Sequence, residues 1–350
     1  MRRIISLFLI VLFCFASFSF PLRSIEVIES NTIYVDDNNT LGPWDGSQEH
    51  PYQFIQDGID NASDGDTVFV YSGTYNDYFP KWRSSVSIYK EINLIGENKQ
   101  NTIINGNKNN SVILIAVSNV TVTGFTLQNY NYQKEWEWNN GLFISGNGYG
   151  IVNIYDNIVK NCSYGIRMSN SRNEISIYNN TIFNNGIGIC SEFSVSPIRI
   201  IDNSVFNNIR GISSLLNDLR LMGNFIGNNK IGINIKFSQP SSIVMNNQIE
   251  NNVLGIRTFG GNATFQENNL IKNQKHVLIF TGTNLKNFFR EYMNRQKWLH
   301  NYWDNWNVNS PRIIIGLGSI YINEDYPYYN PNELLIGFFP FFEVDNNPAK

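Results

Sequence analysis

One pattern of apolar and polar positions recurs every 21 to 23 residues through the middle of the chain. Each copy reads Asn-x3-Asn-x3-Gly, in full or with one substitution. The leading residues are Asn157, Asn180, Asn203, Asn224, Asn247 and Asn269. The second asparagines are Asn161, Asn184, Asn207, Asn228, Asn251 and Asn273, and the glycine place holds Gly165, Gly188, Gly211, Gly232, Gly255 and Val277. A fixed period of this length is typical of a stacked repeat architecture.

Aliphatic residues keep the register of the repeat at three places. They lie three residues before the leading Asn, two residues after it, and directly after the Gly, as in Ile177, Ile182 and Ile189. Around them apolar and polar residues alternate, which indicates short half-buried strands. Asn and Gly tolerate the left-handed backbone of tight turns. The sequence therefore predicts an all-β fold, a single-stranded right-handed parallel β-helix (solenoid), with three aliphatic columns inside and asparagine ladders at the turns.

Both ends of such a stack need to be covered, because open strand edges associate. Residues 54–59 read as a short amphipathic helix that forms an N-terminal helical cap. An aromatic-rich C-terminal cap is expected from Trp298, Tyr302, Trp303 and Trp306, and residues 284–299 have helical spacing that predicts a cap or a lateral helix. The predicted organisation is a signal peptide at 1–24, the N-terminal cap and first strands at 25–90, coils at 91–283 with an insertion at 130–140, and a C-terminal cap or extension at 284–350.

The N-terminus predicts export. Arg2 and Arg3 precede an apolar run from Ile4 to Phe15, which is followed by small residues. This order is typical of a secretory signal peptide, and an uncleaved N-terminal membrane anchor is the alternative. We therefore expect a secreted or cell-surface protein.

Composition narrows the choice of partner. The net charge is −3, and no basic run suggests nucleic acid. Asparagine is the unusual residue, with 55 of 350 positions, and its regular spacing argues for an ordered array. Outside the N-terminal segment the cysteines are Cys162 and Cys190, which could form one disulfide or remain separate thiols. The histidines, cysteines and methionines show no metal-binding spacing, and the sequence does not set the oligomeric state.

Several segments resemble a known superfamily. The stretches 50–59 (HPYQFIQDGI), 64–68 (DGDTV) and 92–96 (INLIG) are similar to the N-terminal cap and first coils of pectin-lyase-like β-helix proteins. The repeats resemble the NosD-like family of carbohydrate-binding and sugar-hydrolase β-helix repeats, and 301–306 (NYWDNW) resembles a segment of archaeal surface proteins. The resemblance implies the fold, whereas its members include lyases, hydrolases, epimerases, adhesins and accessory proteins.

Catalytic chemistry has weak support. The residue before each leading Asn forms one column that contains Asp156 and Asp202, two coils or roughly 10 Å apart. That spacing suits neither a shared Ca²⁺, which only a lyase would require, nor a retaining glycosidase pair. Arg167, two residues after its glycine, completes the one catalytic arrangement that the sequence offers. Solvated turn residues are the simpler interpretation of the two aspartates.

The insertion offers a binding site. It carries Tyr130, Tyr132, Trp136 and Trp138 among Glu and Asn, and it should project from a turn over one lateral face. Such side chains can stack on sugar rings and bind their hydroxyls.

The prediction is therefore a non-catalytic exported β-helix that binds glycans, on a polysaccharide or a glycoprotein surface, along its lateral face. Two alternatives remain. One is a polysaccharide-modifying enzyme (a lyase, a glycoside hydrolase or an epimerase), and the other is a NosD-like accessory protein that delivers metal.

Overall fold

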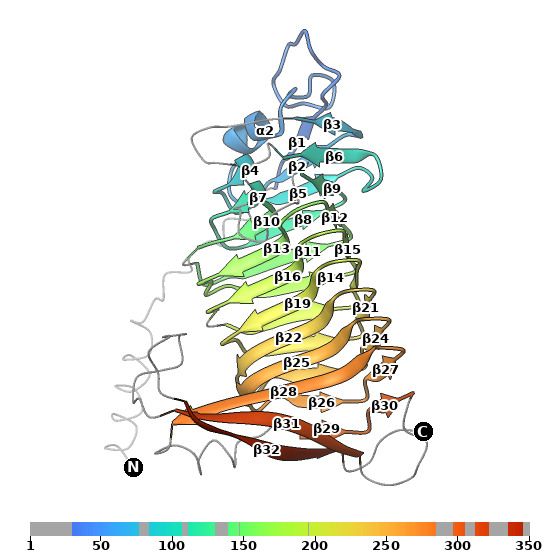
Figure 1. The fold of residues 1–350 in the computed structure, drawn as a ribbon. Helices are drawn as coiled ribbons and strands as arrows, with labels where there is room; N and C mark the ends of the chain where they lie inside the picture. The colour runs from blue at the N-terminus through green and yellow to red at the C-terminus, as the bar shows by residue number, and fades with distance from the viewer. Residues whose placement is uncertain are drawn as a thin grey trace, which may run out of the picture. The chain divides into compact units, whose positions relative to one another are not determined.

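The computed structural model describes residues 30–76, 84–106, 111–129, 139–146, 148–194, 196–284, 297–304, 312–321 and 335–345. From Asn31 onward they belong to one unit, in which the strands stack coil upon coil (Figure 1). The predicted signal peptide and residues 130–138 of the predicted insertion lie outside the described residues, whereas its last two residues, Asn139 and Asn140, are described. No helix in the described part of the chain is long and apolar enough to cross a membrane.

Each coil contributes one strand to each of three parallel sheets, which confirms the predicted β-helix. Sheet 1 contains β4 (Ser84–Ile88), β7 (Ser111–Ile115), β10 (Asn140–Ile144), β13 (Tyr164–Ser169), β16 (Ile187–Glu192), β19 (Arg210–Leu215), β22 (Ile231–Ser238), β25 (Leu254–Gly261), β28 (Lys275–Asn284) and β31 (Arg312–Tyr321).

Sheet 2 contains β1 (Thr32–Val35), β2 (Thr67–Val70), β5 (Asn93–Gly96), β8 (Val120–Thr123), β11 (Ile151–Tyr155), β14 (Glu174–Tyr178), β17 (Ile198–Ile201), β20 (Leu219–Met222), β23 (Ile243–Met245), β26 (Thr264–Gln266), β29 (Lys297–Leu299) and β32 (Leu335–Asp345). β32 also pairs antiparallel with β31, so sheets 1 and 2 join at this end of the stack.

Sheet 3 contains β3 (Gly73–Tyr75), β6 (Thr102–Asn105), β9 (Thr126–Gln128), β12 (Ile158–Lys160), β15 (Thr181–Phe183), β18 (Ser204–Phe206), β21 (Phe225–Gly227), β24 (Gln248–Glu250), β27 (Asn269–Ile271) and β30 (Tyr302–Trp303).

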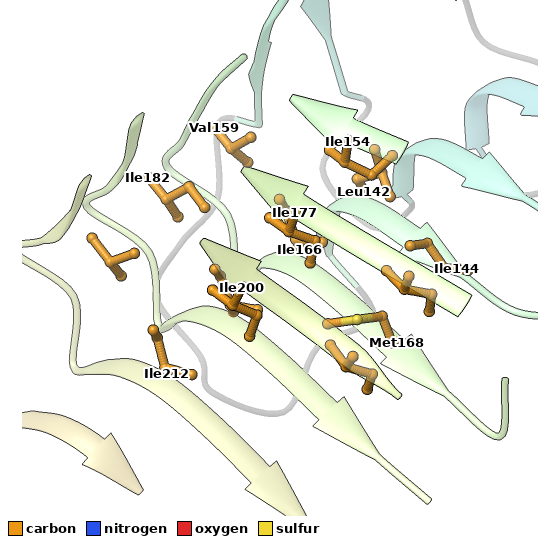
Figure 2. Close-up of a cluster of buried hydrophobic side chains, with 14 of the residues drawn as sticks. Leu142, Ile144, Ile154, Val159, Ile166, Met168, Ile177, Ile182, Ile200 and Ile212 are labelled. Atoms are coloured by element: carbon orange, nitrogen blue, oxygen red, sulfur yellow. The ribbon is translucent and has the colours of Figure 1, made fainter. Parts of the chain in front are cut away.

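The three predicted aliphatic columns form the core. Ile154, Ile177 and Ile200 follow one another in register on sheet 2, and Val159 and Ile182 do the same on sheet 3. All five are at most 1% exposed, and Figure 2 shows them converging on the interior between the sheets. One repeat cannot bury its apolar side alone, so the stack supplies the burial that each coil lacks.

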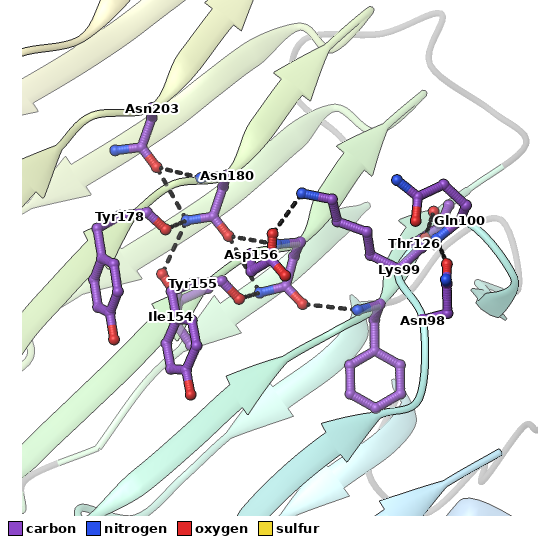
Figure 3. Close-up of polar contacts among 12 residues, drawn as sticks. Asn98, Lys99, Gln100, Thr126, Ile154, Tyr155, Asp156, Tyr178, Asn180 and Asn203 are labelled. Carbon is purple, nitrogen blue, oxygen red and sulfur yellow. Dashed lines mark hydrogen bonds and ion pairs between the residues drawn. The ribbon is translucent and has the colours of Figure 1, made fainter. Parts of the chain in front are cut away.

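The leading asparagines form a continuous buried ladder. The Nδ2 of Asn180 donates to Asn203 Oδ1 at 3.0 Å and to two main-chain carbonyls, while the main-chain N–H of Asn180 donates to the same Oδ1 at 3.0 Å (Figure 3). The pattern runs through Asn157, Asn180, Asn203, Asn224, Asn247, Asn268 and Asn301. It ends on the buried Asp345, whose Oδ2 accepts Asn301 Nδ2 at 3.2 Å.

The sixth copy of the repeat is shifted by one residue from the prediction. Asn268, not Asn269, is the ladder residue, because Asn247 Nδ2 donates to Asn268 Oδ1 at 2.9 Å and β27 begins at Asn269. With this register Phe265 and Leu270 occupy their aliphatic columns and are fully buried. His276 then takes the glycine place of this copy.

A second ladder lies one residue after the second asparagine of the pattern. Asn184 and Asn207 have positive φ angles of 56° and are exposed at the turn. Asn185 and Asn208 are buried instead, and Asn185 Nδ2 donates to Asn208 Oδ1 at 3.2 Å. The ladder members are Asn185, Asn208, Asn229, Asn252 and Asn273. Cys162 occupies the equivalent place in the preceding coil, where burial raises the pKa of its thiol.

The two ends differ. The predicted N-terminal helix is α2 (Ile55–Asn61), which buries Ile55 and Ile59 against the first coils. At the other end Trp298 stacks on Phe265 with ring centroids 4.2 Å apart, and the equally buried Trp303 donates to Asp345. The predicted helix at 284–299 is wrong where it can be checked, since Asn284 ends β28 and 297–299 form β29; 285–296, like Trp306, lie outside the described residues.

Candidate functional site

The two aspartates of the predicted catalytic column lie on the turn between sheets 2 and 3. Asp156 and Asp202 have φ angles of 52° and 53°, the left-handed conformation that this turn repeats in successive coils. The Asp156 carboxylate forms an ion pair with Lys99, which reaches it from an earlier coil (Figure 3). Both carboxylates are exposed. They therefore serve the turn as αL residues, a place that Asn179 takes in the coil between them.

Arg167 lies elsewhere, on the outer face of β13 in sheet 1. Its Nη2 donates to Glu192 Oε2 at 2.9 Å. Its guanidinium carbon lies 4.6 Å from the ring centroid of Tyr164 and 5.8 Å from that of Phe143. The structure thus gives Arg167 an acidic and an aromatic partner within sheet 1, while Asp156 is paired with Lys99 on the turn beyond sheet 2. The aromatic residues Tyr130, Tyr132, Trp136 and Trp138 lie outside the described residues.

The outer face of sheet 1 concentrates positive charge. The column that begins at Arg167 continues in register through Cys190, Ser213 and Asn234 to Arg257. The same strands add the cations Arg210, Lys236 and Lys275. Among the sheet 1 strands β13, β16, β19, β22, β25 and β28, the only acidic residue is Glu192, and Arg167 already binds it. This part of sheet 1 is called the cationic face below.

The cations of this face perturb one another. Partial burial lowers the pKa of Arg257 below its usual range, and the charge of Arg210 lowers it further. Partial burial also lowers the pKa of Lys236, with Arg257 and Arg210 adding to the effect. Like charges held together in a partly desolvated place disfavour their own ionised forms, so an incoming anion would relieve both costs. A cluster of perturbed groups on one surface is a candidate functional site.

The cationic face also has an apolar side. Phe259 lies beside Lys236 in register, and Phe280 follows it on β28. The rings of Phe237 and Phe259 meet edge to face at 5.3 Å, and those of Phe259 and Phe280 stack at 6.4 Å. Nearer the start of the strands, Tyr164, Ile187 and Cys190 form a small buried cluster outside the main core. The thiols of Cys162 and Cys190 are both free and buried, so the disulfide alternative between them is wrong.

Comparison with known proteins supports the architecture. Residues 59–307 match the family model described as periplasmic copper-binding protein (NosD). The A-module of mannuronan C-5 epimerase AlgE6 from Azotobacter vinelandii is similar in structure, with a TM-score of 0.52 and 17% identity over 70% of this chain and 80% of that one. The GH136 lacto-N-biosidase from Eubacterium ramulus has a TM-score of 0.53 and 13% identity over 73% of this chain and 60% of that one. A search of curated proteins found no match. At these identities the two structures show a shared fold alone.

The described residues do not fit the copper that the family description names. No three His, Cys, Asp or Glu side chains gather in the described part of the chain. His276 is buried and its Nε2 lies 2.8 Å from Asp304 Oδ1, while burial raises the pKa of Cys190 to about 12. Copper prefers imidazole and thiolate ligands that converge on one point, and the described histidines and cysteines form no such group.

Proposed function

The chain belongs to the periplasmic copper-binding protein (NosD) family, and from this premise we propose that it is an exported β-helix that binds acidic polysaccharides on its cationic face without converting them. The observation that carries the proposal is the composition of that face, where the neighbouring strands β19, β22 and β25 contribute Arg210, Lys236 and Arg257. A polymer with regularly spaced anionic groups can neutralise several such cations at once, as a neutral glycan cannot. The periplasmic location named for the family supports the predicted signal peptide at 1–24.

Binding is favoured over turnover by the charge balance of the face. A calcium-dependent lyase would need several carboxylates to hold the ion. The sheet 1 strands from β13 to β28 supply Glu192 alone, and it is paired with Arg167. The turn aspartates Asp156 and Asp202 extend from another side of the coil.

The first test removes two charges from the face. Replacing Lys236 and Arg257 together with glutamine is expected to weaken binding to polygalacturonate about 100-fold or more, because a charge-assisted hydrogen bond contributes at least about 1.5 kcal/mol and two are lost. Isothermal titration in low salt measures the effect, and the wild-type affinity should fall as salt is added.

The matched control is Arg220→Gln. Arg220 is exposed on β20 in sheet 2, so this substitution removes a similar charge from a different face. The affinity for polygalacturonate should stay within twofold of the wild-type value. Equal losses of affinity in both variants would show that only the net charge of the protein matters. If the wild type bound neutral dextran as tightly as polygalacturonate, the proposal would be contradicted. Release of unsaturated or shortened oligosaccharides by the wild type would contradict the absence of turnover.

The insertion at 130–140 provides a second test. Its last residue, Asn140, is the first residue of β10 in sheet 1, so the chain enters this sheet from the insertion. We propose that Trp136 and Trp138 contribute ring stacking to the same polymer. Replacing both with alanine should weaken binding about tenfold, in keeping with a few kilocalories of aromatic contact at most. Because stacking is uncharged, the salt dependence of binding should stay as in the wild type; an unchanged affinity would remove the insertion from the binding site.

A further inference from the structure

A hydrogen-bonded relay crosses three coils on the cationic face. Arg257 Nε donates to Asn234 Oδ1 at 2.7 Å, and Asn234 Nδ2 donates to Ser213 Oγ at 2.9 Å. The three residues are in register on β25, β22 and β19. Asn234 is 2% exposed although its place in the column is on the outer face. Both ends of its amide are used, so its orientation is fixed.

The relay decides which edge of the Arg257 guanidinium remains available. A guanidinium has five N–H donors, one of them on Nε. Asn234 accepts the Nε–H, and no carboxylate among the described residues forms an ion pair with Arg257. The two Nη groups therefore present a planar pair of donors held by the protein. Such a pair matches the two oxygens of one carboxylate.

Lys236 provides a second point of attachment. It lies on the neighbouring strand, opposite Phe259 and two residues along from the position opposite Arg257. The two Cα atoms are therefore roughly 8 Å apart. The Lys236 ammonium is a mobile point charge, whereas the Arg257 guanidinium is held in one orientation. Arg257 thus selects the orientation of the bound carboxylate, and Lys236 adds electrostatic attraction.

We propose that Asn234 is a positioning residue of a carboxylate subsite, in which it holds Arg257 so that the two Nη groups bind one uronate carboxylate end-on. The inference rests on the proposed function and specifies its ligand as a carboxylated, not a sulfated, polymer. Ser213 keeps the Asn234 amide turned so that its oxygen faces Arg257.

A double-mutant cycle tests the proposal with polygalacturonate as the probe. Arg257→Gln and Asn234→Ala should each weaken binding about tenfold. The double variant should bind no more weakly than Arg257→Gln, because Asn234 acts only through Arg257. A structural role for Asn234 would instead add its own loss in the Arg257→Gln background and would overturn the proposal. An effect of Arg257→Gln without any effect of Asn234→Ala would overturn it too, while the proposed function would stand.

Two further measurements keep the test decisive. Ser213→Ala leaves Asn234 in place but removes the acceptor of its amide N–H, and should weaken binding about threefold. This variant tests the proposal independently if Asn234→Ala is too unstable to purify. Dextran sulfate is the second probe. The wild type should bind it more weakly than polygalacturonate at equal charge density, and the Asn234→Ala loss should be smaller for it; tighter binding of the sulfated polymer would overturn the carboxylate assignment. No effect of Arg257→Gln on either polymer would overturn the carboxylate subsite, and no effect of the combined Lys236→Gln and Arg257→Gln replacement would overturn the proposed function itself.

Discussion

Replacing Asn203 with alanine is expected to lower the free energy of unfolding by about 3–5 kcal/mol, one of the two largest effects of any single change in this chain. Asn203 Oδ1 accepts both the main-chain N–H and the Nδ2 of Asn180, each at 3.0 Å. Its own Nδ2 donates to the carbonyl oxygens of Ile177 and Ile201 and to Asn224 Oδ1. Alanine would remove the buried acceptor of the Asn180 main-chain N–H and one hydrogen bond from each of the other groups, and a buried group left unpaired costs about 1–3 kcal/mol.

The position of Asn203 in the middle of the ladder enlarges the effect. The ladder amides point the same way in every coil from Asn157 to Asn301, and the last one donates to the Asp345 carboxylate. Each hydrogen bond therefore polarises the next. A gap at Asn203 separates the ladder into two shorter ones. Equilibrium unfolding in urea, followed by circular dichroism, would measure the loss.

Asn207→Gly is the matched control for this prediction. Asn207 belongs to the same repeat and also sits at a turn, but it is exposed and has a φ of 56°. Glycine adopts that conformation freely, so the stability should change by less than about 1 kcal/mol. Similar losses in both variants would show that the repeat needs asparagine at turns for a reason other than the buried ladder.

The repeat made the fold predictable, because its period and its aliphatic columns are both visible in the chain. The exact residues of the second ladder were not predictable. Four of the coils carry two adjacent asparagines at the turn into sheet 1, such as Asn184 with Asn185, and either could point inward. In the coil where Cys162 follows Asn161, asparagine stands only at the exposed position, so the sequence of that coil favours the wrong position for the ladder. Only the backbone conformation, positive φ at Asn184 and not at Asn185, decides which side chain is buried.

The candidate site was less accessible to sequence reasoning than the fold. The column from Arg167 to Arg257 can be aligned from the repeat, but its residues differ in type and include no acid. Arg210 and Lys236 occupy other places in the repeat, so their charges meet Arg257 only once the coils are stacked and the strand faces are known. Asp156 and Asp202 recur in register in the sequence, and the left-handed turn conformation accounts for that recurrence. Repetition thus revealed the scaffold, while the site is formed by the positions at which the repeats differ.

Replacing Gly211 with alanine is the second prediction with a large expected effect. A Cβ atom on Gly211 would lie 2.6 Å from the carbonyl oxygen of Gly232 in the next coil, and the same approach recurs from Gly165 to Gly255. The obstacle is main chain, so it cannot rotate away, and the coils would have to move apart. We expect a loss of about 3 kcal/mol or more in the free energy of unfolding, toward the upper end of overpacking costs.

The control for Gly211 is Gly227→Ala, on β21 of the same coil stack. There a new Cβ would meet the ring of Phe225 at 2.7 Å, and the nearest main-chain oxygen, that of Glu250, lies 3.6 Å away. A half-buried side chain can rotate, so the loss should stay below about 1 kcal/mol. Comparable stability of the two variants in thermal unfolding would contradict the close main-chain packing.

The two glycine variants also test the cationic face, because the glycine column sets the distance between coils. That distance determines the lengths of the hydrogen bonds from Arg257 to Asn234 and from Asn234 to Ser213. Gly211→Ala should therefore weaken binding to polygalacturonate even at temperatures where the variant remains folded, whereas Gly227→Ala should bind as the wild type does.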